Sequence, residues 1–179
     1  MHLGYSFSML GAAIFALSGC SAVQAPTSRD VPAALSAPGD QVMFLEALAT
    51  GVQIYECAPK SGSGYEWVFK APEAPLVDRS GRSLGKHYAG PTWESNDGSI
   101  VVGEVKARDP GPSPSAIPWL LLAAKSNSGS GAFAAIKNIQ RVATIGGVAP
   151  SAEACTSANV KQVARVPYTA TYYFYRATR

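Results

Sequence analysis

The sequence predicts an all-β fold, a single antiparallel β-sandwich or barrel-like domain of about eight short strands with little helix. Its apolar residues come in short runs separated by turn residues, not in long stretches with helical period. Seventeen glycines and 13 prolines among 179 residues supply many turns, yet they stay below the combined share of roughly 25–30% that marks disordered chains. The length suits one domain and is too short for a barrel of alternating strands and helices.

The first strands are expected in the segment that follows residue 39. Residues 42–48 and 52–57 flank Thr50 and Gly51, which predicts a hairpin with its turn at that pair. Residues 65–70 are aromatic and β-branched, so they predict a strand, and Pro72 is expected to end it.

The middle of the chain carries the strongest turn signals. Residues 78–82 predict a turn, and Asn96-Asp97-Gly98 predicts a hairpin between residues 92–94 and 100–105. Residues 117–124 are nearly all apolar, as in a strand buried on both faces. Residues 133–144 fit either helix or strand, and we interpret them as a strand because glycines bound the run.

The C-terminal residues 160–166 and 168–177 predict further strands, because Thr, Tyr and Phe dominate the second run. Successive strand residues point to opposite faces, so Tyr172 and Phe174 share one face while Tyr173 and Tyr175 share the other. A β-sandwich strand needs only one face for the core. We expect the second aromatic face to be covered by loops of the same chain, with a partner surface or ligand platform as the alternatives.

Residues 1–19 are interpreted as a signal peptide. Residues 9–17 form an apolar stretch too short to cross a bilayer permanently. Leu17-Ser18-Gly19-Cys20 resembles a bacterial lipobox, which predicts lipidation of Cys20, although the leader has no Lys or Arg before its apolar stretch. The alternative is an ordinary secretory signal with no role for Cys20.

Residues 20–38 are rich in Ala, Ser, Pro and Thr and are expected to form a tether between the lipid anchor and a β-domain at residues 39–179. A lipid anchor alone would then hold the protein to the membrane. Ser21 after Cys20 favours the periplasmic face of the outer membrane, and a soluble secreted protein is the alternative.

Two cysteines, Cys57 and Cys155, remain once Cys20 is assigned to lipid. Both would lie in a compartment that permits disulfides, so the sequence predicts that they pair. Closing a loop of about 100 residues would stabilise the fold by roughly 4–5 kcal/mol on the chain-entropy model.

Composition argues against several classes of partner. The net charge of +3 is spread without a basic run, which disfavours nucleic acid. The predicted mature chain has a single histidine, His87, and no carboxylate cluster, so no metal site and no cofactor are predicted. Gly81-Arg82-Ser83-Leu84-Gly85 matches the spacing of a hydrolase nucleophile elbow, but the turn-rich flanks lack the helix that an elbow requires.

The candidate ligand-binding residues are His87, Tyr88, Trp93, Glu94 and Arg141. The first four lie within eight residues of one another and combine stacking surfaces with polar contacts, as small-molecule pockets do. The alternative is structural: Trp93 in the core, Glu94 on a solvated face and His87 hydrogen-bonded to backbone. Arg141 could bind an anionic ligand or pair with a carboxylate within the protein. No residue is identified as catalytic.

Several segments together resemble DUF3455, a family of exported bacterial and fungal proteins of unknown function. The resemblance spans nearly everything from Val31 to Ala177, and the segments that carry it are residues 51–57, 87–94, 97–99, 117–121, 139–142, 146–150, Cys155 and 167–170. It implies a single secreted domain and supports the pairing of Cys57 with Cys155, but it transfers no catalytic residue. Some fungal relatives bear a malate dehydrogenase label, which this chain contradicts because no Gly-x-Gly-x-x-Gly follows a strand.

Two classes of function follow from these observations. The first is a non-catalytic module of the cell envelope that binds a small molecule, a glycan or a protein, favoured by scarce titratable groups and abundant aromatic residues. The second is a small hydrolase that uses His87 with Glu94 or Asp97, which lie close together in the sequence. Convergence of His87, Glu94 and Arg141 in one pocket would favour the enzyme, and an aromatic groove without paired titratable groups would favour binding.

Overall fold

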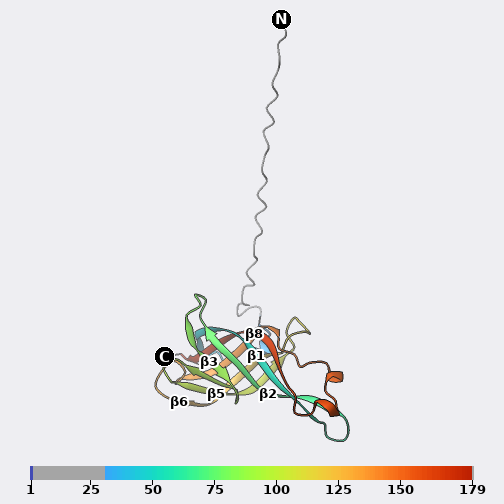
Figure 1. Ribbon diagram of the computed structural model, residues 1–179. Helices are drawn as coiled ribbons and strands as arrows, with labels where there is room; N and C mark the ends of the chain where they lie inside the picture. Colours follow the sequence, from blue (N-terminus) through green and yellow to red (C-terminus); the bar gives the residue numbers. More distant parts are fainter. Residues whose placement is uncertain (2–30, 179) are drawn as a thin grey trace.

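The computed structural model describes Met1 and residues 31–178, so the predicted signal peptide, Cys20 and most of the predicted tether lie outside the described residues. Eight antiparallel strands form one closed barrel, in which each strand pairs with its neighbours in sequence and β8 closes against β1 (Figure 1). The all-β prediction is confirmed, and of its two alternatives the chain adopts the barrel.

The strands differ greatly in length. Their bounds are β1 (Gln41–Pro59), β2 (Tyr65–Val77), β3 (Ser83–Tyr88), β4 (Thr92–Ser95), β5 (Ile100–Asp109), β6 (Trp119–Ser128), β7 (Ile136–Gly146) and β8 (Val163–Ala177). The helical elements are the 3-10 turns η1 (Ala33–Leu35), η2 (Ala152–Ala154) and η3 (Ser157–Asn159). Within the described residues, no helix has the length and apolar character needed to cross a membrane.

The predicted hairpin at Thr50 and Gly51 is wrong, because β1 runs through both residues as one continuous strand. Gly51 serves a different purpose there. A Cβ at this position would collide with the backbone oxygen of Glu73 in β2, so glycine allows the two strands to approach closely. The glycine that resembled a turn is a point of close packing between barrel strands.

Pro72 does not end β2, which continues through Pro72 and Pro75 to Val77. The pairing of β2 with β1 omits Pro75, so its missing N–H costs no bond in that ladder. Pro167 likewise does not interrupt its strand. The two predicted C-terminal strands are one continuous strand, β8.

Other local predictions are confirmed. The turn at residues 78–82 separates β2 from β3, and Asn96-Asp97-Gly98 forms the turn between β4 and β5. The ambiguous run at residues 133–144 is a strand from Ile136 onward. Phe133 lies before that strand, and its side chain is fully buried at one end of the barrel.

That end of the barrel holds the main apolar core. Phe133 stacks on Phe174 of β8, with 4.6 Å between ring centroids. The other fully buried large side chains of this core come from several strands, among them Leu76, Trp93, Val101, Leu122 and Ile139. The interior is packed at this end and hollow at the other.

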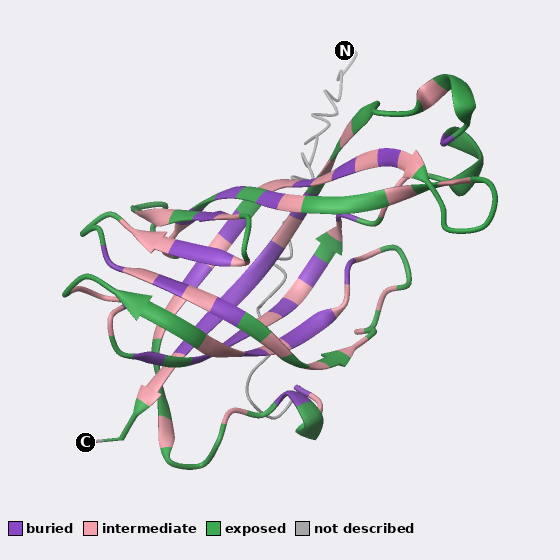
Figure 2. Cartoon of the chain, turned by 90° about the horizontal axis from the view of Figure 1, so that it is seen from below, coloured by how far each residue is buried: buried purple, intermediate pink, exposed green. Residues whose placement is uncertain are grey.

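The outer aromatic face of β8 is covered by the chain's own N-terminal segment, as predicted. Tyr173 forms a second apolar cluster with Val31, Leu35, Trp119 and Val142. The Gln140 side chain donates a hydrogen bond to the Leu35 backbone oxygen at 2.6 Å, which fixes η1 against the barrel. In Figure 2, η1 is the small helical turn at the bottom of the view, next to a buried stretch of the chain. The folded region therefore begins before residue 39, since residues assigned to the tether pack against the strands.

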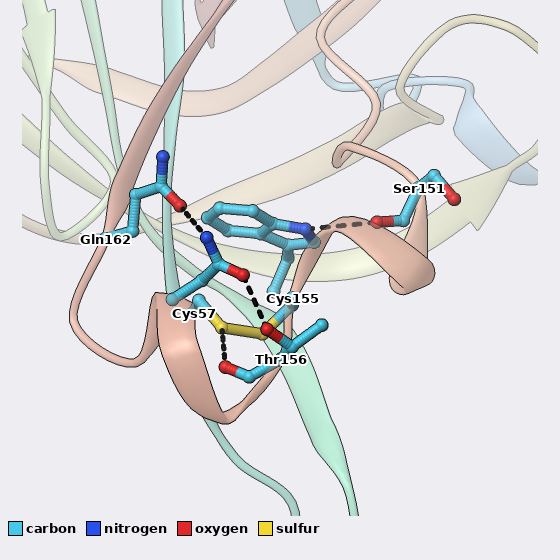
Figure 3. The surroundings of a disulfide bond; sticks show 7 residues. Cys57, Ser151, Cys155, Thr156 and Gln162 are labelled. Atoms are coloured by element: carbon cyan, nitrogen blue, oxygen red, sulfur yellow. Dashed lines mark hydrogen bonds between the residues drawn. A yellow bond between two sulfur atoms is a disulfide. The ribbon is translucent and has the colours of Figure 1, made fainter.

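The predicted disulfide between Cys57 and Cys155 is present, with 5.4 Å between the two Cα atoms. It joins the far end of β1 to the β7–β8 connection (Figure 3). The Cys57 N–H donates to the Gln162 backbone oxygen at 2.9 Å, and the Trp67 indole N–H donates to the Ser151 backbone oxygen at 3.2 Å. The hairpin formed by the C-terminal end of β1 and the N-terminal end of β2 projects beyond the barrel, and the β7–β8 connection lies beside it (Figure 1).

Candidate ligand-binding cavity

The hollow end of the barrel contains a cavity of about 400 Å³. All eight strands contribute side chains to its lining, because every second residue of each strand points inward. A volume of this size lies within the range of roughly 300–1,000 Å³ that small-molecule pockets occupy. The barrel interior is therefore the candidate site.

Three aromatic rings in contact with one another form the floor of the cavity. The His87 and Trp93 rings lie nearly parallel, with 4.4 Å between centroids and an interplanar angle of 10°. Tyr172 meets both edge-on, at 5.1 Å from His87 and 5.5 Å from Trp93. On its other side, Trp93 contacts Phe174 edge-on at 6.1 Å, so these rings separate the cavity from the packed end.

The walls above this floor are largely apolar. Tyr55 and Phe69 pack edge-to-face at 5.6 Å on one side. The aliphatic side chains that line the cavity are Val105, Ile117, Leu120 and Leu122. Aromatic and aliphatic walls of this kind are typical of small-molecule pockets.

His87 is neutral at physiological pH. Burial lowers its pKa to about 3, and the positive charge of Arg141 acts in the same direction, while a backbone hydrogen bond opposes them. That bond joins Nδ1 to the Thr92 backbone oxygen at 2.8 Å. Because a carbonyl oxygen can only accept, Nδ1 carries the proton and Nε2 is left as an acceptor.

Arg141 brings a positive charge into the barrel. Its Nε and Nη2 groups donate to the Pro118 backbone oxygen at 3.1 and 2.8 Å, which orients the guanidinium. No carboxylate lines the cavity, and Arg141 forms no ion pair with any residue that the structure describes. Burial raises the pKa of the Tyr172 hydroxyl, and the charge of Arg141 opposes that shift.

One buried donor in the lining lacks a hydrogen-bond partner among the described residues. It is the Trp93 indole nitrogen, on a side chain that is 1% exposed. A buried donor without a partner costs roughly 1–3 kcal/mol. A ligand or water in the cavity would recover that free energy.

The cavity opens where its lining residues become exposed. Phe69, Lys70, Gly90 and Arg108 are exposed members of the lining, and they come from β2, the β3–β4 turn and β5. Lys70 pairs with Glu56 at 3.2 Å. Arg108 has no such partner in the described part of the chain, so the opening is also electropositive.

The structure brings together three of the five residues that the sequence singled out. His87, Trp93 and Arg141 line the cavity, while Tyr88 and Glu94 do not. The pairs His87–Trp93 and Lys86–Glu94 are neighbours in the β3–β4 register, so Glu94 points to the opposite face from Trp93. There the Tyr88 hydroxyl donates to Glu94 Oε2 at 3.0 Å, and Lys86 lies 3.2 Å from Oε1.

Asp97 lies at the packed end of the barrel, away from His87. Its Oδ1 accepts hydrogen bonds from the Ser99 N–H at 2.8 Å and the Ser99 hydroxyl at 2.5 Å, and its Oδ2 accepts from the Ala132 N–H at 2.8 Å. These bonds, the Ser99 hydroxyl first among them, lower the pKa of Asp97 to about 2. The Ser99 hydroxyl also accepts from the Phe133 N–H at 2.9 Å. Asp97 therefore fastens the connection that carries Phe133 into the barrel.

The acid and base of the hydrolase hypothesis are thus not assembled. His87 is inside the barrel, Glu94 is on its outer face and Asp97 is at its other end. In the part of the chain that the structure describes, no group of three or more His, Cys, Asp or Glu side chains could hold a metal ion.

Sequence reasoning missed several polar or aromatic contributors to the cavity, among them Gln53, Tyr55, Phe69 and Arg108. Of these four, only Gln53 was indicated by the sequence pattern. It shares a strand face with Tyr55 and Cys57, so a polar residue occupied an inward position of an otherwise apolar face. Arg108 and Phe69 lie in distant segments that only the barrel closure brings together.

Comparison with known proteins places the chain in one family. Residues 38–176 match the family described as "Protein of unknown function (DUF3455)", which covers most of the chain, so this protein belongs to the DUF3455 family. No curated protein and no solved structure matches it significantly. The family description names no activity.

Proposed function

We propose that this protein binds a small molecule in its barrel cavity without transforming it, as a module of the bacterial cell envelope. The observation that carries the proposal is the cavity itself, about 400 Å³ in volume and lined by all eight strands. A concave site with largely apolar walls favours a small molecule over a glycan or a protein partner.

The chemistry of the lining supports binding without catalysis. A general base works best with a pKa near the working pH, whereas the pKa of His87 is about 3. Among the described residues, no carboxylate lines the cavity to act beside it. The other polar side chains of the lining include several hydrogen-bond donors, which would orient a ligand.

The experiment that tests this proposal is titration of the full chain with N-phenyl-1-naphthylamine, a neutral dye that fluoresces in apolar surroundings. We expect saturable fluorescence that Val105→Trp abolishes, because the larger side chain fills the cavity from β5. Val163→Trp is the matched control, since Val163 is 53% exposed and does not line the cavity. Both variants must keep the wild-type circular dichroism spectrum. Fluorescence that does not saturate, or that is equal in both variants, would overturn the proposal.

The lipid anchor is the second part of the proposal, and it rests on the lipobox-like residues that end at Cys20. It would hold the cavity at the periplasmic face of the outer membrane. Labelled palmitate should be incorporated by the full chain and not by Cys20→Ala. Incorporation by the mutant would refute the anchor and leave the binding proposal to its own test.

A further inference from the structure

The charge inside the barrel specifies what kind of molecule the cavity fits. Arg141 is half-buried and forms no ion pair with any residue between 31 and 178, and no carboxylate lines the cavity. Removing a guanidinium from water is costly unless an anion compensates it. The Pro118 carbonyl that Arg141 contacts is a neutral acceptor and supplies no opposite charge.

The influence of this charge reaches the other polar groups in the barrel. The positive charge of Arg141 opposes the rise in pKa that burial causes at the Tyr55 and Tyr172 hydroxyls, and it adds to the depression of the His87 pKa. Arg108 stands at the opening without an ion-pair partner among the described residues. The potential along the path into the cavity is therefore positive, which attracts anions.

An unpartnered donor points to the same kind of ligand. Trp93 Nε1 is a buried N–H group in the lining that lacks an acceptor in the described residues. A carboxylate only accepts hydrogen bonds and has two oxygens to share between donors. One carboxylate group could thus pair with the arginine and also accept from the indole.

We propose that the ligand is a small aromatic acid, with its carboxylate held by Arg141 and its ring packed against the His87, Trp93 and Tyr172 rings. Stacked and edge-on aromatic contacts are the ones that this floor offers to a flat ring. The inference rests on the proposed function and adds to it the chemical class of the ligand.

Three naphthalene probes of similar size and different charge test the inference: 2-naphthoate, 2-naphthamide and 2-naphthylmethylammonium. Each is measured by displacement of N-phenyl-1-naphthylamine from the full chain at pH 7. The carboxylate should bind at least about tenfold more tightly than the amide, because hydrogen bonds to charged groups are the stronger ones. The ammonium should bind more weakly than the amide. This order is measured on the wild-type protein and needs no variant.

Variants then assign the preference to Arg141. In Arg141→Gln the ratio of carboxylate to amide affinity should fall to near one, and in Arg141→Lys part of it should remain. Arg165→Gln is the matched control, because Arg165 is an exposed cation that pairs with Glu73 outside the cavity, and it should keep the wild-type ratio.

The outcomes separate the two proposals. Saturable dye binding with equal affinity for carboxylate and amide would overturn the aromatic-acid inference and leave small-molecule binding intact. A carboxylate preference that survives in Arg141→Gln would also overturn it. Absence of saturable dye binding would overturn both.

Discussion

The two ends of the barrel are built from the same eight strands but held in different ways. At the packed end, large apolar side chains fill the interior, with Phe133 stacked on Phe174. At the hollow end, polar and covalent links fix the strands and loops to one another. The Thr144 hydroxyl donates to the Ile117 backbone oxygen at 2.6 Å, and the Tyr55 hydroxyl donates to the Gly147 backbone oxygen at 2.7 Å.

The disulfide belongs to the same set of links. It joins Cys57 of β1 to Cys155 in the β7–β8 connection, the segment that begins at Gly147. Native disulfides in small exported domains typically stabilise them by about 2–5 kcal/mol. The hollow end therefore keeps its shape without an apolar filling, and this is what allows a cavity to persist there.

A matched pair of substitutions in β5 tests this comparison most directly. Val101 is fully buried at the packed end. Val105, further along the same strand, lines the cavity. Val101→Ala should lower the free energy of unfolding by about 2–3 kcal/mol, because it removes buried methyl groups and leaves a void. Val105→Ala should cost about 1 kcal/mol or less, since its side chain already borders empty space. Chemical denaturation followed by circular dichroism measures both values.

Equal losses for the two variants would show that the hollow end contributes as much packing as the other. A larger loss at Val105 would reverse the comparison. The identical substitution on one strand removes differences in chemistry and secondary structure from the measurement.

The sequence was sufficient for features that depend on local chemistry. The Asn96-Asp97-Gly98 turn forms where it was predicted, because its residues favour that turn in any context. The predictions at Gly51 and Pro72 were wrong because the roles of these residues depend on their tertiary neighbours. Gly51 meets β2 at close range, and β2 continues past Pro72 because β1 pairs with it on both sides of that proline.

The candidate site was predictable only in part for a related reason. Across Gly90-Pro91 the alternation of side chains cannot be counted, so the sequence could not say that Trp93 turns inward and Glu94 outward. The cavity forms where the inward-pointing side chains are too small to fill the barrel. Its position therefore depends on how all eight strands close around it. Arg141 was identified as a possible anion site, but only the fold shows that no carboxylate of residues 31–178 pairs with it.

The pH dependence of stability provides a smaller test of the hollow end. The pKa of His87 is about 3 in the folded protein, against 6.5 for an exposed histidine. Between these values the unfolded chain binds a proton that the folded chain does not, so acid favours unfolding. The free energy of unfolding should therefore fall by about 2 kcal/mol between pH 6.5 and 4.5 on account of His87.

His87→Phe isolates this contribution, because phenylalanine keeps a flat ring beside Trp93 but cannot titrate. The groups that face His87 are Tyr172 and Arg141, and neither changes charge in this window. Asp78 and Asp97, with pKa values of about 2, lose their stabilising charge only at lower pH. Urea denaturation at both pH values should show a decline in the wild type that is steeper by about 2 kcal/mol than in the variant. Parallel declines would mean that water or a proton reaches His87 freely, and the aromatic floor would then not seal the packed core from the cavity.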